Sequence, residues 1–371
     1  MKTSTLAFEL ADHIVSRPTR AVANVGVDVT DDRIIGVGGL PLWGELLDRL
    51  GLYDEANRRR LRIIGPTGYN GGECYRALVE VLLAGGDFLS DRDLLDGAAI
   101  AELRGEHRLP SHPTLWRFAA GASPGRPQAA AAVNRTMLGR AWAMGAGPAG
   151  DTLTIDPDAT AVETYGPGKE GSTFGYQGKV CLAPFVGVCG QTGDVLGVRA
   201  RGGNANPGRA LAGFMRECLA AVPEPLRKSK RIWFRIDSAG YQDQVIRAAE
   251  ALHADYSISV KRNPRMVAAI AGLAADATTR WRKAGGHEGR RGSTVAETTV
   301  VLGDGTTARC LRLIVRRQRA ATSSSSPSTT STAPTGISRW SPTSNGSGCR
   351  RWRWRRITGC AAACRKARSP G

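Results

Sequence analysis

Two aspartates stand where apolar, strand-like segments end. Asp158 lies in "TIDPDAT", and Asp237 ends "RIWFRID" and is followed at once by Ser-Ala-Gly. A buried carboxylate is costly unless a positive group pairs with it. Each aspartate could cap the turn or helix that follows it. Alternatively, both could bind Mg²⁺, which prefers oxygen ligands such as carboxylates and keeps water molecules beside a substrate.

The order of the surrounding segments indicates that the two carboxylates converge. Residues 151–166 alternate in strand fashion, and residues 178–203 predict two strands joined by the turn "GQTGD"; a helix, a strand, a helix and a strand follow. We expect an α/β fold with a mixed sheet that has helices on both faces, in which the first strand and the strand after the first helix lie side by side. Two divalent ions about 3.5–4 Å apart can activate a water and stabilise the leaving oxygen of a phosphodiester. Asp156 shares the strand face of Asp158 and is an alternative first acid.

Composition divides the chain into three parts. Residues 1–146 read as mostly helical, residues 147–318 as an α/β core with a β-rich insertion at about 277–317, and residues 319–371 as a Ser/Thr/Pro-rich and then Arg/Trp-rich tail. The first part is either a helix-turn-helix-like region that binds DNA ends or a plain helical bundle. The tail's composition does not build a packed core, so we expect it to be disordered.

The charge of the chain points to a polyanionic partner. The formal net charge is +18, and the sequence pI is about 10.2. Nucleic acid is the commonest partner of so basic a protein. Nine of the basic residues and no acidic residue lie in 320–371, so the first 319 residues carry 18 − 9 = +9. The basic residues that we expect at phosphates, if they are not merely solvated, are Arg117, Lys169, Lys179, Arg199, Arg201, Lys261 and Arg262.

The sequence gives little support for a membrane protein, a secreted protein, a zinc protein or a nucleotide-binding protein. No run of about 18 apolar residues occurs, which argues against a membrane span. Glu9 and Asp12 interrupt the apolar part of the N-terminus, unlike a signal peptide, so we expect a cytoplasmic protein. The eight cysteines and five histidines show no zinc-ligand spacing. The glycine-rich "GYNGGECY" lacks the lysine and the spacing of a P-loop.

Several segments in one order resemble a known family. The segments "TIDPDATAVETYGPGKEGSTFGYQGKV", "LAPFVGVCGQTGDVLGVRARGGNA" and "RIWFRIDSAGY", with "LPSHPTLWRF" upstream, resemble the DDE transposases of bacterial insertion sequences, in the branch with an Asp-x-Asp-x-Thr strand. The likeness spans about residues 25–318. It implies a ribonuclease-H-like core, Asp158 and Asp237 as the first two acids, and two Mg²⁺ or Mn²⁺ ions. It also implies double-stranded DNA as the partner, both terminal inverted repeats and target DNA. No membrane partner is expected, and a homodimer is compatible with the sequence.

The family's third acid has no counterpart in this chain. The resemblance implies a Glu on a helix beyond the β-rich insertion, but no acidic residue follows Asp304. Read in a shifted frame with free wobble bases, the tail can spell a further strand and a segment that permits a Glu. A frameshift near codon 318 would therefore explain the loss, and we expect the chain to be catalytically defective.

Three other interpretations stay open. One is a non-catalytic transposase remnant that only binds DNA, and another is a different two-metal nuclease that needs no third acid. In the third, the cluster "WRWRR" binds membranes or nucleic acid through its interleaved aromatic and basic residues.

Overall fold

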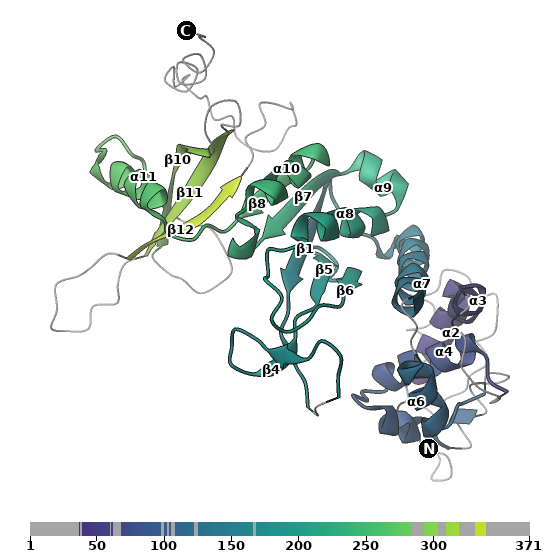
Figure 1. Cartoon of the computed structure of the whole chain (residues 1–371). Coiled ribbons are helices and arrows are strands. Elements are labelled where there is room, and N and C mark those ends of the chain that lie inside the picture. The colour runs from purple at the N-terminus through teal and green to yellow at the C-terminus, as the bar shows by residue number, and fades with distance from the viewer. Residues whose placement is uncertain are drawn as a thin grey trace, which may run out of the picture. The chain divides into compact units, whose positions relative to one another are not determined.

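The computed structural model shows a chain that divides into two compact units, Met1–Gly147 and Pro148–Gly371 (Figure 1). Among the described helices, none is long and apolar enough to span a bilayer. The structure describes residues 37–338 except 38, 60, 62–67, 98–99, 102–103, 105–107, 122–124, 166–167, 284–292, 303–308 and 319–330. The acidic residues of the N-terminus and the "WRWRR" cluster lie outside the described residues.

The N-terminal unit is built from short helices. They are α2 (Leu40–Leu50), α3 (Leu52–Arg58), α4 (Gly71–Leu83), the 3₁₀ helix η2 (Leu89–Leu95), α6 (His112–Ala120), α7 (Gly125–Ala141) and the short turn η3 (Trp142–Ala146). Gly51 separates α2 from α3 with φ 66°, a conformation that favours glycine. Asn70 and Glu73 form a reciprocal capping box that starts α4. Leu47, Leu115 and Val133 lie in the apolar core that these helices share.

Two buried glutamates connect the helices of this unit. Glu55 on α3 accepts hydrogen bonds from Arg58 and Arg59 and, at 3.0 Å, from Thr136 on α7. Burial acts to raise the pKa of Glu55, but the hydrogen bonds from Arg59, Arg58 and Thr136 outweigh it and lower that pKa to about 2. Because α3 and α7 are held through this carboxylate, its ionisation should contribute to stability.

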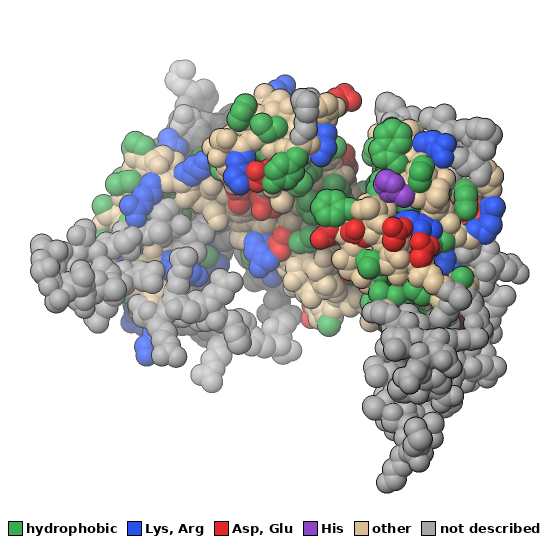
Figure 2. Space-filling model, turned by 90° about the horizontal axis from the view of Figure 1, so that it is seen from below, with side chains coloured by type: hydrophobic (Ala, Val, Ile, Leu, Met, Phe, Trp, Pro, Cys, Tyr) green, Lys and Arg blue, Asp and Glu red, His purple; other side chains and the backbone are tan. Residues whose placement is uncertain are grey.

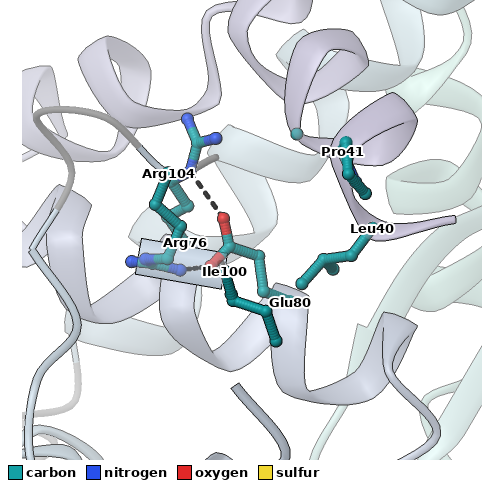
Figure 3. A pocket seen from close by; sticks show the side chains of 7 residues that line it. Leu40, Pro41, Arg76, Glu80, Ile100 and Arg104 are labelled. Atoms are coloured by element: carbon teal, nitrogen blue, oxygen red, sulfur yellow. Dashed lines mark hydrogen bonds and ion pairs between the residues drawn. The ribbon is translucent and has the colours of Figure 1, made fainter. Parts of the chain in front are cut away.

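Glu80 on α4 lies between two arginines beside a small pocket (Figure 3). Arg76 donates to Glu80 at 2.7 Å and also contacts Asp48 on α2, and Arg104 forms an ion pair with the other oxygen of Glu80. Burial lowers the pKa of Arg104 to about 10, and the charge of Arg76 adds to this effect. The cluster is a paired and buried network, so we assign it a structural role in the packing of α2 against α4.

The C-terminal unit contains a central mixed sheet. Its five core strands are β1 (Thr152–Ala159), β5 (Phe185–Cys189), β6 (Val195–Arg199), β7 (Arg231–Ile236) and β8 (Asp255–Ile258). They lie in the order β6-β5-β1-β7-β8. The strands β6, β5 and β1 are antiparallel neighbours, whereas β1, β7 and β8 run parallel. This is the ribonuclease-H-like arrangement, and the predicted fold class is confirmed.

Helices α8 (Leu211–Ala221) and α10 (Asp243–Ala251) contact each other and the sheet; α9 (Glu224–Ser229) precedes β7 and α11 (Pro264–Ala275) follows β8. Leu153, Ile155 and Phe234 are fully buried. Phe214 of α8 stacks on Phe185 of β5 with ring centroids 5.1 Å apart. The alternate residues of β1 and β7 are partly or fully exposed, so the opposite side of these strands is accessible.

Strands continue beyond the core. β9 (Arg282–Lys283), β10 (Ser293–Leu302) and β11 (Arg309–Gln318) form the β-rich insertion, and β12 (Ser331–Ser338) pairs with β11 on one side and β8 on the other. For residues 331–338, the expectation of a tail without structure was therefore wrong. A strand ladder needs only backbone hydrogen bonds, so a Ser/Thr-rich segment can form one without contributing to a core. The edges of β8 and β11 supply the partners.

Candidate active site

Asp158 and Asp237 lie at the carboxyl ends of two neighbouring parallel strands. Asp158 is the penultimate residue of β1, and Asp237 directly follows β7. The ladder between β1 and β7 pairs Thr152 with Arg231 and ends at Ile155 with Phe234. Continued by three residues, the register sets 158 beside 237. Both residues are exposed, and both fall on the accessible face because side chains alternate along a strand.

Each of the two carboxylates makes a local hydrogen bond through one oxygen. Asp158 Oδ1 accepts from the backbone N–H of Ala159 at 2.7 Å. Asp237 Oδ1 accepts from the N–H of Ala239 at 3.0 Å and thereby caps the short 3₁₀ turn η4 (Ser238–Gly240). The capping role considered for Asp237 is thus present. It uses Oδ1 only, so it is compatible with a second role at Oδ2.

Asp156 is in a different electrostatic situation. Arg235 of β7 donates from Nε to Asp156 Oδ1 at 2.9 Å and from Nη2 to Oδ2. Both carboxylate oxygens are thereby used in a bidentate ion pair, the geometry that suits a guanidinium. Among the described residues, neither Asp158 nor Asp237 has an ion-pair partner. This contrast favours Asp158 over Asp156 as the first acid.

The described residues supply two carboxylates here but no cluster of three. No group of three or more His, Cys, Asp or Glu side chains with metal-site geometry occurs among them. Two exposed carboxylates on adjacent strands fit a hard divalent cation that also retains water ligands. They leave a second cation without a carboxylate of its own in the described part of the chain.

Two of the predicted phosphate-binding residues lie near the same edge of the sheet. Lys261 and Arg262 follow β8, and both are exposed. Because β1, β7 and β8 run parallel, their carboxyl ends lie at one edge, which also carries Asp158 and Asp237. Both cations thus follow β8 at the sheet edge that carries Asp158 and Asp237.

The other predicted cations are more dispersed. Arg199 forms an ion pair with Glu217 of α8, and Arg201 lies over the ring of Phe185, 3.9 Å from its centroid. Lys179 forms an ion pair with Glu163 at 2.8 Å, and Lys169 is exposed. Arg117 belongs to α6 in the other unit and donates to the carbonyl of Pro113 at 3.2 Å. Arg199 and Arg201 thus have clear structural partners within the core.

Arg235 is the residue near the site that the sequence interpretation missed. It stands two positions before Asp237 in "RIWFRID", so strand alternation places both on one face. That spacing was a usable signal. Its pairing with Asp156 required the strand register, which the sequence alone does not provide.

The strand order and the two carboxylates at its edge are typical of ribonuclease-H-like proteins that cut or join nucleic acid strands. A comparison with protein-family models matches residues 18–324 to the transposase DDE domain group 1. The chain therefore belongs to this family of DDE transposases, whose members bind DNA and use divalent metal ions in DNA transposition.

Among solved structures, one match is the piggyBac transposase synaptic complex with hairpin DNA, determined by cryo-electron microscopy. It shares 15% sequence identity with a TM-score of 0.33, and the alignment covers 83% of this chain and 62% of that chain. The present chain thus spans less than two thirds of that transposase. A comparison with curated proteins finds no match.

Proposed function

We propose that the protein derives from the transposase of a bacterial insertion sequence and that its reaction centre is the carboxylate pair Asp158 and Asp237. The observation that supports this most is the register of β1 and β7, whose continuation sets the two aspartates side by side on the accessible face. The family membership supports the reaction class, which is phosphodiester hydrolysis at the element's ends followed by strand transfer.

In this proposal the side chains hold and orient the reacting groups. Asp158 and Asp237 would hold Mg²⁺ or Mn²⁺ through their carboxylates, while the backbone N–H groups of Ala159 and Ala239 donate to their Oδ1 oxygens. Bound divalent ions supply the activation of water and the stabilisation of the leaving 3′-oxygen. Lys261 and Arg262, both exposed near the same sheet edge, position the DNA backbone through its phosphates.

Arg235 contributes by keeping Asp156 out of the metal site. Its guanidinium engages both oxygens of Asp156, which is two residues from Asp158 on the same strand. Without that partner, Asp156 would add an unpaired negative charge beside the two ligands. We therefore infer that Asp156 and Arg235 fix the position of β1 against β7 and that neither binds the metal.

The second candidate function is a DNA-binding remnant without catalysis. It is favoured by the absence of any acidic residue after Asp304, where the family pattern places the third acid, and by the two-carboxylate site of the described residues. The second divalent ion would then lack an anchor, and fixed metal positions are what two-metal catalysis requires.

A cleavage assay separates these two functions. DNA that carries the element's ends is incubated with Mg²⁺ or Mn²⁺ and either the chain as written or a variant in which the alternative reading frame beyond codon 318 is restored. The remnant interpretation predicts strand cleavage by the restored variant alone, and Asp158→Asn in that variant should abolish it while Asp156→Asn should not. Equal cleavage by both chains would mean that the third acid lies within residues 1–318 and would refute the remnant interpretation.

A further inference from the structure

A small second sheet leaves an apolar face uncovered. It consists of β2 (Val162–Glu163), β4 (Val180–Leu182) and β3 (Thr173–Phe174), in the order β2-β4-β3. The register pairs Val162 with Leu182 and Phe174 with Val180. Directly paired residues point to the same side, so these four side chains share one face. Phe174 is 71% exposed and Val162 is 47% exposed. We call these three strands, with the described residues that connect them, the aromatic sheet.

Two tyrosines add to the exposed aromatic surface of this sheet. Tyr165 follows β2 and is 76% exposed, and Tyr176 lies in the turn between β3 and β4 and is 86% exposed. Three large aromatic side chains thus face solvent within twelve residues, from 165 to 176. Isolated exposed apolar residues are common on proteins, whereas a cluster of aromatic residues indicates an interaction site.

The aromatic sheet lies next to the carboxylate pair along the chain. β2 begins four residues after Asp158, and Tyr165 is seven residues from it, which limits their separation to about 25 Å even for extended chain. Figure 1 shows β4 projecting from the end of the central sheet near β1 and β5. Figure 2, a view from below, shows hydrophobic side chains at the surface among acidic and basic ones. DNA that reaches Asp158 therefore comes within reach of this sheet.

The chemistry of the aromatic sheet fits bases better than phosphates. Its charged residues are Glu163, Lys169, Glu170 and Lys179, which sum to zero. A neutral surface gains little from the phosphate backbone, whereas the rings of Phe and Tyr stack on unpaired bases. A second copy of the chain is a poor fit, because three strands of two or three residues offer only about 140 Å² by strand geometry, far below the roughly 800 Å² per partner of a standard interface.

We propose that the aromatic sheet binds unpaired bases of the DNA beside the point of cleavage, with Phe174 and Tyr176 as the stacking residues. This inference rests on the proposed function, since it needs DNA at Asp158. The aromatic sheet would then form a base-binding site in addition to the carboxylate pair.

Fluorescence binding with two synthetic probes tests this proposal. One probe is a fully paired duplex, and the other has the same sequence with a short unpaired segment that contains 2-aminopurine. Binding is measured with the full chain and without divalent ions, so that no cleavage occurs. We expect Phe174→Ala and Tyr176→Ala each to weaken binding of the unpaired probe about tenfold, to reduce the change in 2-aminopurine fluorescence, and to leave the paired duplex unaffected. Tyr176→Phe, which keeps the ring, should bind like the unaltered chain.

Phe88→Ala is the matched control, because Phe88 is also 71% exposed but belongs to the other unit. It should leave the preference for the unpaired probe unchanged. Equal affinity of the unaltered chain for both probes, or equal loss on both probes in the Ala variants, would overturn the base-binding proposal and leave the proposed function intact. Failure of the unaltered chain to bind either probe would overturn both. A change of oligomeric state in the Ala variants, measured by sedimentation, would instead identify a second copy as the occupant and refute the proposal.

Discussion

The ionised carboxylate of Glu55 should make the stability of the N-terminal unit depend on pH. The perturbation is Glu55→Gln, which keeps the size of the side chain and removes its charge. Glu55 is buried, and its hydrogen bonds from Arg59, Arg58 and Thr136 hold its pKa at about 2 against an ordinary value of 4.5. A folded-state pKa below the unfolded one gives stability that is complete above the unfolded value and is lost as the pH falls through the folded one.

The size of this effect follows from the shift. A difference of about 2.5 pKa units corresponds to about 3 kcal/mol at pH 7, of which about 2 kcal/mol is lost by pH 3. Solvent reduces it, because the side chain of Arg58 is 63% exposed, so the measured contribution should be on the order of 1–2 kcal/mol. The loss should occur between about pH 5 and pH 2.

Urea unfolding followed by circular dichroism measures this contribution, because the described elements of the N-terminal unit are helices, whose loss changes the signal. The unaltered chain should exceed Glu55→Gln in free energy of unfolding at neutral pH, and the difference should shrink as the pH is lowered to about 3. Asp54→Asn, at the neighbouring position of α3, is the matched control and should change little. A difference between the unaltered chain and Glu55→Gln that stays constant from pH 7 to pH 3 would show that the ionised carboxylate of Glu55 does not stabilise the unit.

Other perturbations concern the core and the tail. Phe214→Ala should lower the free energy of unfolding by about 3–5 kcal/mol, because Phe214 is fully buried against Phe185. Val198→Ala, at an exposed site, should change it by less than about 0.5 kcal/mol. Both values are measured by urea titration, and similar losses in the two variants would contradict the packing of Phe214. Deletion of residues 319–371 should lower the melting temperature, because it removes β12 from between β8 and β11. Deletion of 339–371 should leave the melting temperature unchanged. Equal melting temperatures of the two deletion variants would argue against a stabilising role of β12. The shorter deletion removes nine basic residues, so it should also flatten the salt dependence of duplex affinity, and an unchanged slope would show that the tail makes no phosphate contact.

The elements around the site were largely predictable from local pattern. The alternation in "RIWFRID" predicts the strand β7, and the order of strands and helices predicts that it lies beside β1. The Asp156–Arg235 pair was not predictable, because it depends on register and on the rotamer of a long side chain. Nor was β12, since its Ser, Pro and Gly residues have low strand propensity and the ladder arises from the free edges of β8 and β11.

The role of the buried glutamates was hidden for a similar reason. Glu55 and Glu80 read as ordinary charged positions on amphipathic helices, where exposure is the usual outcome. Their burial follows from arginines one turn away on the same helix and, for Glu80, from Arg104 on a distant segment. Only the tertiary arrangement shows that these carboxylates are paired.

Mn²⁺ titration followed by electron paramagnetic resonance tests whether Asp158 and Asp237 share a divalent ion. The titration compares the unaltered chain with Asp158→Asn, Asp237→Asn and the control Asp156→Asn, whose native carboxylate is engaged by Arg235. We expect either of the first two substitutions to weaken Mn²⁺ binding by at least about tenfold and Asp156→Asn to leave it unchanged. Mn²⁺ binding that survives both Asp158→Asn and Asp237→Asn, or that is lost only in Asp156→Asn, would contradict it.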